Sequence, residues 1–182
     1  IVKQTIIYIL SLFILTFDLK AEGLYFQSYE VNKDLRTTLN LTPEETLSLA
    51  KGFSMDFDLK LRREKHNFGY IFRMIINDNQ NLDLVVRSSS PSRSYFLIVG
   101  NENRLTYSCE NNKQDDIEWT HITICYTKGN DELTLKIGDT VQKLKLNGTI
   151  PSFTNVKLFF GETKHHIYST TDVAPMTIRN IE

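Results

Sequence analysis

The sequence predicts an all-β fold, built as an antiparallel sandwich of two sheets. From residue 119 to 181 the chain is a series of short runs rich in β-branched and aromatic residues: WTHITICY, ELTLKI, VQKLKL, NVKLFFG and VAPMTIRNI. Turn sequences such as Lys128–Asp131 and Gly138–Asp139 separate these runs. With the runs further upstream they make about a dozen strands at spacings of roughly 8 to 14 residues, the rhythm of a sandwich or barrel.

The first clear strand runs from Phe53 to Arg62, where apolar residues hold the odd positions and polar residues the even ones. This alternation predicts one face in the core and one face in water. The next strand, Phe68 to Ile76, is apolar at both parities. We therefore expect it to be covered on both faces or to line a concave surface.

The remaining elements follow in chain order. Strands are expected at residues 82–86, 95–99, 104–109, 119–126, 132–137, 141–146, 155–161 and 173–181. The one helical candidate is a single turn at Pro43–Thr46, with Thr42 as its N-cap. Ten side chains of these strands are expected in the core: Phe53, Met55, Phe57, Leu59, Ile122, Ile124, Leu135, Ile137, Leu158 and Ile178.

The N-terminal segment has the pattern of a secretory signal peptide. It combines a basic residue at Lys3, an apolar centre at Ile6–Phe17 and a small residue at Ala21. The apolar centre is short for a membrane span, which needs about 20 residues. We expect cleavage after Ala21, which leaves one domain at residues 22–182 in the periplasm, at the cell surface or secreted, with no insertion in the membrane. The alternatives are an uncleaved anchor or a buried helix.

Charge excludes two classes of partner. The chain has 21 basic and 22 acidic side chains and a net charge of −1, without a run of like charge. Nucleic acid and anionic membrane surfaces both require a concentrated basic field, so neither is expected as a partner. The two cysteines that survive export, Cys109 and Cys125, either form a disulfide, which an oxidising compartment permits, or stay separate thiols.

The strand that begins at Trp119 carries a family resemblance. A Trp, then His121, then alternating aliphatic residues resembles the W-x-H-[IV]-x-[IV] strand of laminin G-like and pentraxin-like domains, which are concanavalin A-like jelly rolls. The strand pair 133–146, Phe159–Gly161 and the closing run 176–181 resemble the following strands of that family. The resemblance covers most of residues 23–182 and implies a concanavalin A-like jelly roll of two antiparallel sheets.

The resemblance also implies a function. The superfamily includes sugar-binding lectin modules, adhesion and receptor domains, some glycosidases and accessory domains. Both ends of the domain are similar to N-terminal exported domains of larger bacterial surface proteins, which implies downstream domains. We expect a non-catalytic recognition module for a carbohydrate or a protein surface; the alternatives are a structural domain that positions a downstream module, or a glycoside hydrolase.

The residues argue against catalysis. Retaining glycosidases of this fold place two carboxylates on one strand in an E-x-D-x-E pattern, about 5 Å apart. The nearest string, Gln114–Glu118, lacks the first Glu, and Asp56 and Asp58 share a face with Lys60 as an ordinary exposed face does. The sequence has neither a G-x-S-x-G elbow nor an H-E-x-x-H helix. No catalytic residue and no obligatory cofactor is expected.

Binding candidates come from the two-sided strands and from the Trp119 strand. Aromatic platforms and hydrogen-bonding groups recognise glycans and protein surfaces, and plain core or inter-strand packing is the alternative for each of these side chains. The candidates are Tyr70, Phe72, Arg73, Arg87 and His121. Calcium is a further candidate ligand, with oxygens from Asn79, Asn81, Asp78, Asp83 and Asp172.

Overall fold

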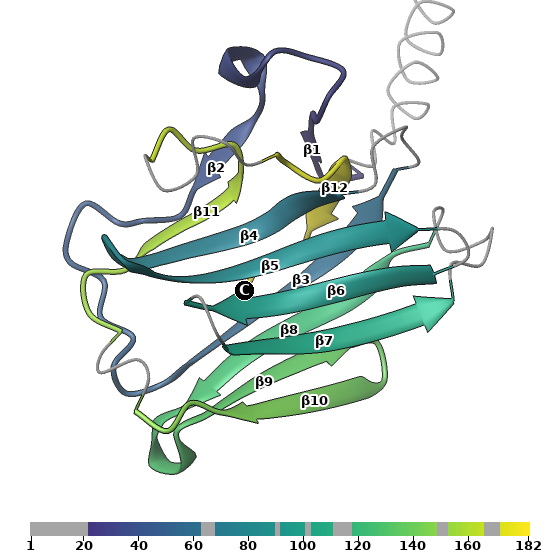
Figure 1. Cartoon of the computed structure of the whole chain (residues 1–182). Coiled ribbons are helices and arrows are strands. Elements are labelled where there is room, and N and C mark those ends of the chain that lie inside the picture. Colours follow the sequence, from purple (N-terminus) through teal and green to yellow (C-terminus); the bar gives the residue numbers. More distant parts are fainter. Residues whose placement is uncertain are drawn as a thin grey trace, which may run out of the picture.

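Two antiparallel sheets of six strands each pack face to face in a computed structural model of the chain (Figure 1). The structure describes residues 22–62, 68–89, 92–100, 103–110, 118–148, 153–165 and 172–182. This architecture confirms the predicted two-sheet jelly roll. The expected signal peptide at residues 1–21 lies outside the described residues. No helix in these described ranges is long and apolar enough to cross a membrane.

The strands are divided between two sheets, called A and B. Sheet A has the order β1 (Leu24–Phe26), β12 (Met176–Arg179), β3 (Phe53–Leu61), β8 (Thr120–Thr127), β9 (Glu132–Ile137) and β10 (Thr140–Lys145). Sheet B has the order β2 (Thr38–Asn40), β11 (Lys157–Gly161), β4 (Phe68–Asn77), β5 (Gln80–Ser89), β6 (Ser92–Val99) and β7 (Asn103–Glu110). Two short 3₁₀ turns, η1 (Lys33–Leu35) and η2 (Lys128–Asn130), complete the described elements.

The core lies between the sheets and matches the predicted set. Nine of the ten expected side chains are buried, and Phe53 is half-buried against the same cluster. The ring of Phe160 on sheet B meets Phe57 of sheet A edge-on, with centroids 5.0 Å apart. Burial of each such side chain contributes about 1.5 to 3 kcal/mol to the free energy of folding. The apolar residues that alternate along β3 and β8 therefore explain why the two sheets pack together.

Side chains of both parities are buried in β4 from Ile71 to Ile76, in agreement with its two-sided apolar sequence. A register shift between Tyr70 and Phe72 in its ladder with β5 marks a β-bulge. Ile71 and Phe72 both join the core, and Arg73 then lies on the outer face of the sheet although its side chain is fully buried. The bulge therefore decides which of these side chains face outward.

The N-terminal segment links the two sheets. Strand β1 pairs with β12 in sheet A, and β2 pairs with β11 in sheet B. Phe26, the last residue of β1, fills the core beside Gly161, whose φ of 76° and lack of a side chain leave room for the Phe26 ring. These two strands have three residues each, too short for a periodicity signal.

The expected helical turn at Pro43–Thr46 is wrong. Residues 44 and 45 form a bend and not a helical turn. The Thr42 hydroxyl, expected to cap that turn, instead accepts a hydrogen bond from the amide of Leu158 at 2.9 Å. A contact with a distant strand thus replaces the local cap.

Candidate functional site

The outer face of sheet B gathers aromatic and charged side chains at its centre. The ladders place Phe159, Arg73 and Asp83 side by side on β11, β4 and β5. We call this surface the sheet B face; it comprises Tyr70, Arg73, Ile75, Asn81, Asp83, Val85, Arg87, Phe96, Ile98 and Phe159. It is the side of β4 to β7 turned toward the viewer in Figure 1.

Two opposite charges lie beneath this face. Arg73 and Asp83 are opposite each other across β4 and β5, and their exposed fractions are 0% and 2%. The Arg73 guanidinium lies over the ring of Tyr70, 4.7 Å from its centroid, and the Asn81 side-chain amide donates to the Asp83 carboxylate. Buried charges require such compensation, because each loses its hydration.

Tyr70 stays protonated in this setting. Burial raises the pKa of its phenol, the Asp83 carboxylate raises it further, and the Arg73 guanidinium lowers it by less. The backbone holds the same residue, since the Tyr70 amide donates to the carbonyl of Asp172 at 2.8 Å and its carbonyl accepts from the amide of Ala174 at 3.0 Å. Tyr70 is therefore a fixed aromatic platform that keeps its hydroxyl proton.

Two further aromatic rings flank the buried charges. Phe159 lies on one side of Arg73, and Phe96 lies opposite Val85 on the other side of β5. Both rings are half-buried, so they keep accessible surface. At the end of β5, Arg87 is exposed and lies opposite Phe68. The face thus combines three aromatic platforms with an accessible guanidinium.

An open cavity of about 360 Å³ continues this face beyond Ile75, at the turn between β4 and β5. Amides, one carboxylate, one lysine and one imidazole surround it. Its lining residues are Ile75, Ile76, Asn77, Asp78, Thr154, Asn155, Lys157 and His165.

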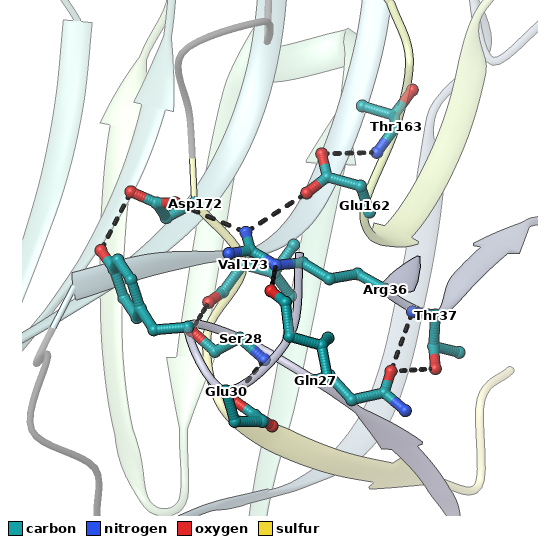
Figure 2. A network of polar contacts seen from close by, with 11 residues as sticks. Gln27, Ser28, Glu30, Arg36, Thr37, Glu162, Thr163, Asp172 and Val173 are labelled. Carbon is teal, nitrogen blue, oxygen red and sulfur yellow. Dashed lines mark hydrogen bonds and ion pairs between the residues drawn. The ribbon is translucent and has the colours of Figure 1, made fainter. Parts of the chain in front are cut away.

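A buried arginine supports the loop next to Tyr70 (Figure 2). Nη1 of Arg36 lies 3.4 Å from Glu162 Oε2 and 3.4 Å from Asp172 Oδ1, and only 5% of the Arg36 side chain is exposed. Its Nε donates to the carbonyl of Val31 at 3.2 Å. We call Arg36 and its two carboxylates the Arg36 hub.

The hub fastens the N-terminal segment to the strand that follows Asp172. The Tyr29 hydroxyl donates to Asp172 Oδ2 at 3.0 Å, and the Ser28 hydroxyl donates to the carbonyl of Val173 at 2.6 Å. Burial, followed by the hydrogen bond to Asp172, raises the pKa of Tyr29 to about 12. Because the carbonyl of Asp172 accepts from the Tyr70 amide, the hub also positions Tyr70.

The outer face of sheet A carries a separate, solvated cluster. His121 Nδ1 lies 3.0 Å from Asp58 Oδ1, and His121 Nε2 lies 3.4 Å from Asp56 Oδ1. Half of the His121 side chain is exposed. Nearby, the guanidinium of Arg179 lies over the ring of Trp119, 4.0 Å from its centroid. We call His121 and its neighbours the sheet A cluster; it comprises Asp56, Asp58, Trp119, His121 and Arg179.

Hydrogen bonds lower the pKa values of the two carboxylates in the sheet A cluster. The Thr123 hydroxyl donates to Asp56 at 2.6 Å, and this bond lowers the pKa of Asp56 against the opposing effect of burial. For Asp58, burial raises the pKa, but the hydrogen bonds from His121, Asn180 and Arg179 together outweigh it and lower the pKa.

The five residues nominated from the sequence fall in three places. Tyr70, Arg73 and Arg87 belong to the sheet B face, Phe72 lies in the core with its ring centroid 5.3 Å from that of Phe160, and His121 is on the opposite sheet. Sequence reasoning missed Phe96, Phe159 and the Arg36 hub. Phe96 and Phe159 lie in runs that are apolar at both odd and even positions. Such a run predicts a strand but does not predict which of its side chains face outward.

The proposed calcium ligands do not converge. Asp78 is exposed at the β4–β5 turn, Asp83 accepts from Asn81, and Asp172 belongs to the hub. Across the described ranges, no group of three or more His, Cys, Asp or Glu side chains is arranged to hold a metal. Cys125 is a free thiol in β8 of sheet A, whereas the Cys109 side chain lies outside the described residues.

Comparison with known proteins shows the fold. No family model and no curated protein matches the sequence. Among solved structures, a family 7 alginate lyase in complex with substrate has a TM-score of 0.55 at 12% identity, over 81% of this chain and 68% of the lyase. A heptameric SAP-like pentraxin from Limulus polyphemus has a TM-score of 0.56 at 15% identity, over 76% and 66% of the two chains.

The mouse laminin α1 chain, domains LG4-5, has a TM-score of 0.56 at 14% identity, and the match covers 87% of this chain and 40% of the laminin chain. At such low identities the likeness shows the fold alone. The chain has the jelly-roll fold of the laminin G, pentraxin and family 7 lyase structures, which confirms the fold that the resemblance in the Trp119 strand implies.

Proposed function

We propose that the domain is an exported, non-catalytic recognition module that binds a carbohydrate chain across the sheet B face. The observation that carries this proposal is the arrangement of Tyr70, Phe96 and Phe159 around a buried pair of opposite charges. Structures of similar fold include the binding domain of botulinum neurotoxin serotype D, which supports a recognition role without identifying the ligand.

The chemistry of the face suits a glycan. Aromatic rings offer flat apolar surface to the C–H face of a sugar, while Asn81 and Arg87 provide hydrogen-bonding groups at the side. Arg73 is fully buried, so it acts as a positioning residue that holds the Tyr70 ring. The open cavity beyond Ile75 extends the face in the direction a chain of several sugars would take.

One observation favours a second candidate, eliminative cleavage of an acidic polysaccharide. A tyrosine beside a guanidinium is present on the face, and a structure of similar fold is an alginate lyase with bound substrate. Proton abstraction by Tyr70 would require its phenolate, and burial together with Asp83 raises the pKa of that phenol. Because general bases work best with a pKa near the operating pH, binding without turnover is the better supported function.

A binding experiment tests the proposal. A panel of immobilised neutral and uronic acid polysaccharides identifies the ligand, and calorimetry gives its affinity. Phe159→Ala and Phe96→Ala should each weaken binding about tenfold, which corresponds to roughly 1.4 kcal/mol. Tyr25→Ala is the matched control, since Tyr25 is an aromatic residue that is 50% exposed on sheet A. Absence of binding across the panel would favour a structural domain instead.

Turnover is measured on the same panel. We expect neither new reducing ends nor unsaturated sugar ends after incubation with alginate. Cleavage that Tyr70→Phe abolishes while the fold is retained would establish the lyase alternative.

N-terminal sequencing of the protein recovered outside the cytoplasm tests export. The mature sequence should begin at Glu22, and a retained Ile6–Phe17 segment would indicate an anchor.

A further inference from the structure

The turn after β10 contains Asn147 and Gly148, the one Asn-Gly pair in the sequence. Both residues are exposed, and both have a positive φ, 51° for Asn147 and 74° for Gly148. Asparagine is one of the chemically labile residues of proteins. An Asn followed by Gly is its most reactive setting, because no Cβ shields the backbone nitrogen next to the Asn side chain and glycine adopts many backbone conformations.

The reaction open to this pair is an intramolecular acyl transfer. The Gly148 amide nitrogen gives its proton to water and attacks Cγ of Asn147, where a new C–N bond forms. The side-chain nitrogen of Asn147 takes up a proton from water and leaves as ammonia. Water then opens the cyclic imide at either carbonyl, which leaves aspartate or isoaspartate at position 147.

A carboxylate holds the nitrogen that would attack. The Gly148 amide donates to Asp131 Oδ2 at 2.6 Å. Hydrogen bonds to an ionised acceptor are about twice as strong as those between neutral groups. The N–H therefore points at Asp131, and the negative charge beside it opposes loss of the amide proton.

Asp131 is itself fixed on both sides of this turn. It ends η2 with φ of 46°, and the Tyr126 hydroxyl donates to its Oδ1 at 3.1 Å. Its carbonyl accepts from the amide of Leu146 at 2.9 Å. Asp131 therefore binds the residue before Asn147 and the residue after it, so the attacking nitrogen is released only when the turn opens.

We propose that Asn147 is a site of spontaneous deamidation, and that the hydrogen bond from Gly148 to Asp131 restrains the reaction in the folded protein. Local opening of the turn or global unfolding releases the nitrogen. The product has a new carboxylate beside that of Asp131, and isoaspartate also adds a carbon to the main chain. Both changes weaken the turn that follows the buried Leu146, so the modified protein should unfold at a lower temperature.

Peptide mass spectrometry of the purified protein, incubated in mildly alkaline buffer made with heavy-oxygen water, tests this proposal. Chromatography separates the aspartate and isoaspartate peptides, and the heavy oxygen marks hydrolysis of the imide. Conversion at Asn147 should be at least about tenfold faster in urea-unfolded protein than in folded protein, since unfolding breaks a hydrogen bond to a charged group. This comparison requires no glycan ligand.

Asp131→Gly removes the restraint without unfolding the chain. Glycine adopts the positive φ of this position freely, and the variant should accelerate conversion in the folded protein at least about tenfold. Tyr126→Phe is the matched control, because it removes only the other hydrogen bond to the Asp131 carboxylate and should leave the rate nearly unchanged. Circular dichroism shows that each variant is folded at the temperature of incubation.

Asn155 provides a control within the same chain. It is exposed with φ of 57°, but Val156 follows it, and the branched side chain hinders attack by the backbone nitrogen. Asn155 should therefore stay intact in the samples in which Asn147 reacts. Equal rates in folded and unfolded protein, a folded Asp131→Gly variant that reacts no faster, or equal conversion at Asn155 would each overturn the proposal.

Discussion

Charged side chains are partly exposed on the outer face of sheet A and buried on the outer face of sheet B. On sheet A, His121 stands between Asp56 and Asp58 with half of its side chain exposed. On sheet B, Arg73 and Asp83 are opposite each other with almost no exposed surface, beneath Tyr70 and between Phe96 and Phe159. Both faces belong to strands of one sandwich, so the difference arises from the side chains around the charges.

Water solvates the charges of the sheet A cluster, whereas neighbouring side chains hold the charges of the sheet B face. Exposed ion pairs contribute little to stability, because water already solvates each charge. A buried pair loses that hydration and depends on its fixed partners. A charge pair that is buried outside the hydrophobic core and flanked by Tyr70, Phe96 and Phe159 fits the recognition role proposed for the sheet B face, whereas the sheet A cluster is an ordinary polar face.

The largest expected effect comes from removing one buried charge. Asp83→Ala leaves the Arg73 guanidinium buried without its opposite carboxylate and should lower the free energy of unfolding by about 3 kcal/mol or more. Asp58→Ala, the matched change on sheet A, should cost less than about 1 kcal/mol. Urea denaturation measures both variants. Equal losses would remove the distinction between the two faces.

An intermediate effect is expected at the Arg36 hub, which supports the sheet B face from the side. Tyr29→Phe removes the hydroxyl that donates to Asp172 and should lower the free energy of unfolding by about 1 kcal/mol. Tyr25→Phe removes a hydroxyl from a ring that is half exposed on β1 and should change it by much less. Thermal unfolding monitored by circular dichroism compares the two, and equal shifts would argue against a structural role for the Tyr29 hydroxyl.

The smallest effect concerns the sheet A cluster and is confined to acid. The pKa values of Asp56 and Asp58 are lowered in the folded protein, so the folded state binds fewer protons there than the unfolded state. Their contribution is complete above about pH 4 and is lost as the pH falls through the lowered values. Thr123→Val removes the hydrogen bond that most lowers the pKa of Asp56 and should make acid unfolding between about pH 4 and pH 2 less steep. An unchanged acid profile would contradict this assignment.

The sequence was sufficient for the fold because the sandwich is encoded in local alternation. The odd and even positions of Phe53–Arg62 predict which face of β3 is buried, and burial confirms it. For β4 the same reasoning fails at the bulge. Tyr70 and Phe72 share a parity in sequence, yet the register shift between them places Tyr70 outside and Phe72 in the core.

The rest of the candidate site depends on contacts that are distant in the chain. Arg36 contacts Glu162 and Asp172, which are more than a hundred residues away in the chain. No local sequence pattern therefore predicts the hub. His121 was nominated together with Tyr70 because it shares the parity of Trp119 in its strand, whereas Tyr70 belongs to a two-sided strand. Only the strand order, which puts β8 in sheet A and β4 in sheet B, separates them.

The proposed function requires that the sheet B face, and not the sheet A cluster, binds a glycan. Chemical shift mapping of isotopically labelled protein, titrated with alginate oligosaccharides and with neutral β-linked glucose oligosaccharides, tests it most directly. Saturable shifts are expected at Tyr70, Arg87, Phe96 and Phe159 with at least one of the two probes. Shifts centred on Trp119 and His121 instead, or none with either probe at millimolar concentration, would contradict it.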